Sequence, residues 1–142
     1  MRWQQTRTFP ARYDSLAVID RFVADAAGRA GFDSCTVYQV QLAVDEACSN
    51  IIEHAYGGEG PEMIECSLQV ADGDLTVVLR DTGQPFDPSI VPEPDVDADL
   101  DARTGGGLGL FFIRRIMDEV TFDFDTEDGN VLTLVRRRRT AC

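Results

Sequence analysis

The feature that most constrains the fold is a long helical periodicity in the middle of the chain. Apolar residues recur there at helical spacing, at Val37, Val40, Val44, Cys48, Ile51 and Ala55. Asp33 or Ser34 can cap the start of this helix, and three glycines with Pro61 end it after Tyr56. The spacing predicts one long amphipathic helix whose apolar stripe lies on the core.

Shorter periodic segments surround this helix. A helix capped by Asp14 or Ser15 precedes it, and a short helix over about 108–118 follows it. Strands are predicted at 4–12, 63–70, 75–80, 120–125 and 131–136. Turns at Asp72-Gly73 and at 127–130 join two pairs of these strands as hairpins. The order predicts one α+β domain over residues 1–142, a two-layer sandwich with a mixed, mostly antiparallel sheet and helices on one face.

The charge balance limits the classes of partner. The 142-residue chain carries a net charge of −12, which argues against direct nucleic-acid binding and against an anionic membrane surface. The arginines at 136–139 are therefore interpreted as a solvated strand end and tail. The sequence contains no lysine. That absence excludes a Walker-type lysine, and leaves arginine as the residue for contact with phosphate or carboxylate.

The cysteines and the apolar segments indicate the compartment. No segment has the pattern of a signal peptide or the length of a membrane span, so we expect a cytoplasmic protein. None of the four cysteines forms a C-x-x-C pair, and we expect all of them to be reduced thiols.

Three polar residues on the long helix form the first candidate site. Glu46, Asn50 and His54 recur at every fourth position, so they share one face. Asn50 offers a neutral oxygen to Mg²⁺, and Glu46 can orient or deprotonate a nucleophile beside a metal-bound phosphate. The alternative is a solvated polar helix face, which such spacings produce often by chance.

The second candidate is the turn that follows the most apolar strand. Asp81 ends this strand, and a buried carboxylate needs donors, such as the exocyclic amine of adenine. Gly83 permits a close approach of the backbone to a flat ring. The alternative is an ordinary Asp-Thr-Gly turn without a ligand.

The third candidate is a glycine cluster, TGGGLGL at 104–110, which leads into the short helix. Glycines before a helix allow backbone N–H groups to converge on an anion, and the helix dipole favours negative charge there. The alternative is a flexible hinge. The segment before it, about 84–106, is rich in Pro and Asp and is predicted to be a mobile lid.

Taken together, the three segments resemble a known family. DEACSNIIEHAY (45–56), DTGQPFDP (81–88) and the glycine cluster with LFFI (110–113) are similar to the N, G1 and G2 boxes of the Bergerat ATP-binding superfamily. The subfamily that the chain most resembles is the bacterial anti-sigma-factor serine/threonine kinases, and the resemblance spans nearly the whole chain.

The resemblance implies a role for individual residues. Asn50 would coordinate Mg²⁺ between the ATP phosphates, and Glu46 would be the general base. Asp81 would accept the adenine amine with Gly83 beneath the ring, and Thr133 would help to hold the adenine through water. Contacts to the phosphates would come from Arg103, Thr104, Gly105, Gly107, Leu108 and Gly109.

The resemblance also implies an activity and partners. The leading hypothesis is a protein kinase that transfers the γ-phosphoryl group of ATP to Ser or Thr of an antagonist with the STAS fold. The same protein would sequester a sigma factor. A homodimer is one expected state, because relatives commonly form dimers. A competing hypothesis is a non-catalytic module that uses ATP only to set its shape. A third is the detached ATPase part of a two-component kinase. His54 is interpreted as structural, because a phosphoacceptor histidine would lie on a separate dimer helix.

Overall fold

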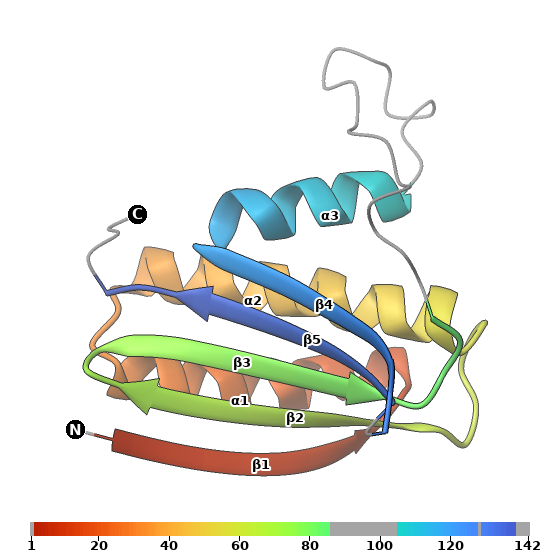
Figure 1. Ribbon diagram of the computed structural model, residues 1–142. Helices are drawn as coiled ribbons and strands as arrows, with labels where there is room; N and C mark the ends of the chain where they lie inside the picture. The colour runs from red at the N-terminus through yellow and green to blue at the C-terminus, as the bar shows by residue number, and fades with distance from the viewer. Residues whose placement is uncertain (1, 86–104, 128, 139–142) are drawn as a thin grey trace.

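The computed structural model describes residues 2–85, 105–127 and 129–138. Within these residues, five strands form one sheet in the order β1-β2-β3-β5-β4, and all neighbouring pairs are antiparallel. The strands are β1 (Arg2–Pro10), β2 (Met63–Ala71), β3 (Asp74–Asp81), β4 (Glu119–Thr126) and β5 (Gly129–Arg136). The helices lie on one face of the sheet (Figure 1). The predicted α+β two-layer sandwich is confirmed, and no parallel pair occurs among the described strands.

Three helices form the second layer of the described structure. They are α1 (Leu16–Arg29), α2 (Ser34–Asn50) and α3 (Gly105–Ile116), and a short 3₁₀ turn, η1 (Tyr13–Ser15), precedes α1. The Asp33 side chain caps α2 by accepting the Thr36 N–H at 2.7 Å. A π-helical turn, η2 (Ile51–Ala55), continues α2, as the Tyr56 N–H bonds to the Ile51 oxygen at 3.0 Å. Single π turns of this kind occur often at functional sites.

The core lies between the helices and one face of the sheet. Along β3, Leu75, Val77 and Leu79 are completely buried, whereas the residues between them are half-buried on the open face. The same alternation places Asp81, the last residue of β3, on the face that the helices cover. Because side chains alternate along the strand, the Asp81 carboxylate lies in the interface between the two layers.

Several element boundaries differ from the sequence-based predictions. β1 ends at Pro10 rather than at residue 12, because Ser15 N bonds to Arg12 O and the chain turns into η1. α3 begins at Gly105 rather than at Leu108, so the glycine cluster forms the first turns of the helix and does not precede it. The helix ends at Ile116, where the buried Arg136 side chain donates to the Ile116 oxygen.

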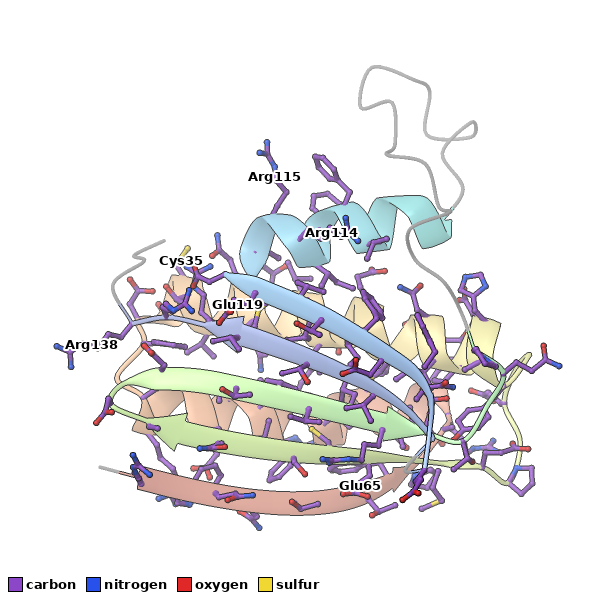
Figure 2. The ribbon with its side chains drawn as sticks, in the orientation of Figure 1. Cys35, Glu65, Arg114, Arg115, Glu119 and Arg138 are labelled. Carbon is purple, nitrogen blue, oxygen red and sulfur yellow. The ribbon has the colours of Figure 1, made fainter. Side chains whose placement is uncertain are left out.

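The cysteines also differ from expectation. Cys35 lies exposed near the start of α2 (Figure 2) and is disulfide-bonded, which corrects the prediction that all four thiols are reduced. Cys48 and Cys66 are free thiols in the core, and burial raises the pKa of both. Among the described helices, none is long and apolar enough to cross a membrane.

Candidate nucleotide site

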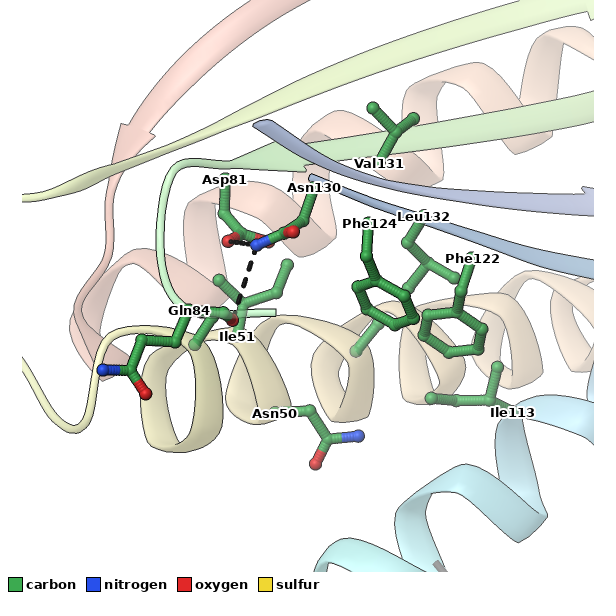
Figure 3. A pocket seen from close by; sticks show the side chains of 12 residues that line it. Asn50, Ile51, Asp81, Gln84, Ile113, Phe122, Phe124, Asn130, Val131 and Leu132 are labelled. Carbon is green, nitrogen blue, oxygen red and sulfur yellow. Dashed lines mark hydrogen bonds between the residues drawn. The ribbon is translucent and has the colours of Figure 1, made fainter. Parts of the chain in front are cut away.

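A pocket opens where α2, η2 and α3 meet the ends of three strands (Figure 3). Its walls are mainly apolar, and its polar groups gather around the end of β3. The lining residues are Ala47, Asn50, Ile51, Ala55, Asp81, Gln84, Ile113, Phe122, Phe124, Asn130, Val131 and Leu132. An apolar cavity with a few convergent polar groups is the usual form of a small-molecule site.

Asp81 is the charged group of this pocket. Its side chain is 7% exposed, and its Oδ1 accepts two hydrogen bonds at 2.9 Å, from the Gly83 N–H and from Asn130 Nδ2. In the described part of the chain, no group donates to Oδ2. A carboxylate held in this way offers one open acceptor beside apolar walls, and such a group binds a donor strongly because water is scarce there.

The turn after Asp81 lies directly against the end of the long helix. Gln84 N donates to the Ala55 oxygen at 2.8 Å, and a Cβ on Gly83 would collide with the same carbonyl group. Glycine is therefore required at position 83 for contact with the protein's own η2 turn. This contact within the chain is distinct from the close approach to a flat ring that the sequence predicts for Gly83.

Asn50 and Glu46 occupy the adjoining part of α2. Asn50 lines the pocket, and in Figure 3 its amide lies toward α3, apart from Asp81. Glu46, one turn earlier, is half-buried and does not line this pocket. Burial first, and then the negative charge of Glu53, raise the pKa of Glu46. A carboxylate with a raised pKa is a better proton acceptor, as a general base requires.

His54 does not join this group. It is exposed and lines a neighbouring hollow with Tyr56, Gly57, Thr82 and Gly83. The predicted common face of Glu46, Asn50 and His54 therefore does not open onto one cavity. Among the described residues, no group of three or more His, Cys, Asp or Glu side chains is arranged to hold a metal ion.

Thr133 is not among the residues that line this pocket. Thr133 pairs with Val78 on the open face of the sheet, because residues of β5 alternate between the two faces. The polar residue of β5 that reaches the pocket is Asn130, which the sequence pattern places in the turn between the last two strands. The missed signal is a polar residue at the inward positions of a strand, in phase with Leu132 and Leu134.

The predicted phosphate contacts fall partly outside the described residues. Arg103 and Thr104 lie there, as does most of the predicted lid at 84–106. Gly105, Gly107, Leu108 and Gly109 belong to α3, whose first turn lies beside the second half of the α2–η2 helix (Figure 1). The first four N–H groups of a helix have no partner within it, so this helix start offers backbone donors to an anion.

The chain is similar to known proteins over most of its length. The family model described as the histidine kinase-like ATPase domain matches residues 9–136. A serine-protein kinase RsbW from Halalkalibacterium halodurans is 32% identical over 133 residues, which are 91% of this chain and 80% of the relative. RsbW from Listeria monocytogenes is 30% identical over 90% of this chain and 84% of its own length.

A solved structure supports the fold independently. The crystal structure of the RsbU and RsbW domains of a Mycobacterium tuberculosis protein superposes with a TM-score of 0.63 at 18% identity. The match covers 98% of this chain and 34% of the longer protein. The resemblance noted from the three sequence motifs is thereby confirmed. The chain belongs to the histidine kinase-like ATPase family, in the group of serine-protein kinases related to RsbW.

Proposed function

We propose that this protein is an ATP-dependent serine/threonine protein kinase. We further propose that it phosphorylates a STAS-type antagonist and acts as an anti-sigma factor that switches between the two partners. The observation that carries the ATP site is Asp81, a buried carboxylate whose Oδ1 has two donors and whose Oδ2 has none among the described residues. The relatives named serine-protein kinase support the reaction class.

The pocket residues fit an adenine base. The exocyclic amine would donate to Asp81 Oδ2, while the apolar walls would cover both faces of the ring. Phe122 and Phe124 lie on one side of the pocket, and Ile51 of the helix lies on the other (Figure 3). Burial of a planar ring between such side chains supplies the apolar part of the affinity, and the Asp81 contact supplies the base selectivity.

The phosphate end would be held by Asn50 and by the start of α3. Asn50 has a neutral amide oxygen, a suitable ligand for Mg²⁺ that also takes phosphate oxygens and water. The ion would neutralise charge on the β- and γ-phosphates. Backbone N–H groups at Gly105 to Leu108 would contact the phosphates, and we keep Arg103 and Thr104 as further phosphate ligands.

Glu46 is the proposed general base. The hydroxyl oxygen of the substrate Ser or Thr would attack the γ-phosphorus, and its proton would pass to Glu46. The bond from the γ-phosphorus to the bridging oxygen would break, and ADP would leave. The raised pKa of Glu46 suits this proton transfer.

The kinase can be tested with γ-labelled ATP and a STAS-type antagonist. Label should appear on the antagonist with the wild-type protein and should be lost with Glu46→Ala, while ATP binding stays intact. Glu127→Ala, which changes an exposed glutamate in the β4–β5 turn, is the matched control and should keep the activity. Absence of label with the wild type, despite ATP binding, would favour the non-catalytic ATP-binding module.

The sigma-factor partner and the quaternary structure need separate measurements. Size-exclusion chromatography with light scattering should show a complex with a sigma factor in the presence of ATP or ADP. Addition of the unphosphorylated antagonist should release the sigma factor. The same measurement on the protein alone decides between a monomer and the homodimer. We place the protein in the cytoplasm, where both partners would be found.

A further inference from the structure

Asn130 is the least expected polar group in the pocket. It pairs directly with Asp81 across β3 and β5, and only 6% of it is exposed. A primary amide at such depth has to find hydrogen-bond partners within the protein. Its Nδ2 lies 2.9 Å from Asp81 Oδ1, 3.0 Å from the Gly83 oxygen and 3.5 Å from the Gln84 oxygen (Figure 3).

These contacts determine which oxygen of Asp81 can accept a hydrogen bond from a ligand. Oδ1 receives the amide of Asn130 from one side and the Gly83 N–H from the other, both at 2.9 Å. The two donors fix the plane of the carboxylate and occupy the accessible lone pairs of Oδ1. A ligand in the pocket therefore meets a single accepting atom of the Asp81 carboxylate, Oδ2.

A carboxylate with both oxygens open to the ligand would bind a different set of purines. With both oxygens open, it can accept the N1–H and the N2 amine of guanine side by side, as carboxylates accept paired donors elsewhere. With Oδ1 occupied, only a single donor can be accepted, as adenine presents with its exocyclic amine. Guanine would then leave a donor unpaired or place its O6 against Oδ2, and either outcome is costly in a dry pocket.

We propose that Asn130 is the positioning residue that makes this site select an aminopurine nucleotide over an oxopurine nucleotide, by occupying Asp81 Oδ1. The inference rests on the proposed ATP site and adds to it the residue that determines the choice of base. Asn130 acts through Asp81, and the same amide secures the turn at Gly83 and Gln84 against the strand.

The decisive variant removes the donor and keeps a side chain that branches at Cγ. Asn130→Leu should free Oδ1, weaken Mg²⁺–ADP binding and strengthen Mg²⁺–GDP binding. We expect the ratio of the two dissociation constants to fall at least about tenfold, which is the usual scale for one misplaced hydrogen bond. Titration calorimetry of both nucleotides with each protein measures this ratio. Asn130→Thr keeps one donor on a strand-compatible side chain and should show an intermediate ratio.

The chain offers a matched control on the neighbouring strand. Thr76→Val changes a half-buried polar residue of β3 on the open face of the sheet, and should leave the ratio unchanged. A folded Asn130→Leu protein with the wild-type ratio would overturn the inference while leaving the ATP site standing. If the Leu variant does not fold, the Thr variant carries the same comparison. A wild-type protein that binds neither nucleotide would remove the proposed ATP site and this inference together.

Discussion

Asp20 and Asp45 place their carboxyl groups beside each other between α1 and α2, and Oδ1 of each is buried without a hydrogen-bond partner among the described residues. The two helices are tied there by Gln41, whose Nε2 donates to the Asp20 backbone oxygen at 3.0 Å. Two neighbouring buried carboxyl groups are less costly when one of them is protonated than when both carry a negative charge. Burial first, then the neighbouring carboxyl group of Asp20 and the charge of Glu46, raise the pKa of Asp45 to about 8. Protonation of Asp45 therefore favours the contact between α1 and the second helix, which carries Glu46 and Asn50.

This pair predicts a pH-dependent stability. The folded-state pKa of Asp45 lies above its unfolded value near 3.8, so the folded protein holds the proton more tightly. The stabilisation is complete below pH 4 and is lost as the pH rises towards 8. Asp45→Asn should remove this dependence and raise the free energy of unfolding at pH 9 by about 1–2 kcal/mol, a value reduced for solvent screening of a half-buried pair.

Urea unfolding at pH 5, 7 and 9 measures the difference. Asp45→Asn and the wild type should be similar at pH 5 and should diverge at pH 9. Glu127→Gln removes one exposed charge of the same sign and controls for the general acidity of the chain. Parallel curves for Asp45→Asn and the wild type at every pH would contradict the raised pKa of Asp45.

Glu53 predicts a shift in the pH profile of phosphotransfer. The Tyr13 hydroxyl donates to Glu53 at 2.9 Å, and the charge of Glu53 is the second cause, after burial, of the raised pKa of Glu46. Glu53→Gln should lower the pKa of Glu46, so the acid limb of the rate profile should move to lower pH. Glu59→Gln is the control, since Glu59 bonds to the Tyr13 N–H but is not a cause of the Glu46 shift. Equal profiles for both variants would exclude Glu53 from this role.

Two glycines should respond to alanine in opposite directions. Gly83→Ala places a Cβ against the Ala55 carbonyl, so it should destabilise the fold by about 1–3 kcal/mol and weaken ADP binding. Gly28→Ala adds a methyl group to α1 where nothing lies within 4 Å, and should stabilise the protein by about 0.5–1 kcal/mol. Scanning calorimetry of the two variants tests this contrast. A neutral Gly83→Ala would show that the G1 turn can move away from η2.

Two neighbouring arginines should differ in their effect on stability. Arg136 is 4% exposed and donates to the Ile116 oxygen at the end of α3, so Arg136→Met should cost about 2–4 kcal/mol. Arg137 forms a more exposed ion pair with Glu119 at 2.6 Å, so Arg137→Met should cost less than about 1 kcal/mol. Chemical denaturation gives both values. Equal losses would show that the buried arginine does not anchor α3.

Much of the architecture follows from local sequence patterns. The apolar stripe from Val37 to Ala55 predicts the central helix, and Asp72-Gly73 predicts the β2–β3 hairpin, whose turn residues both have positive φ. The position of Asp81 at the end of an alternating strand is enough to indicate that the carboxylate faces the core. These features depend on spacings of a few residues, so the sequence alone contains them.

The pairings within the site are long-range, and only the tertiary structure decided them. Asn130 bonds to Asp81 across 49 positions, and the register of β3 with β5 puts Asn130 inside and Thr133 outside. A one-residue shift of that register would exchange the two faces. Likewise, the η2 turn meets Gly83 only because the sheet and the helices pack together. The sequence by itself determined which residues are suited to bind a nucleotide, and strand register determined which of them meet.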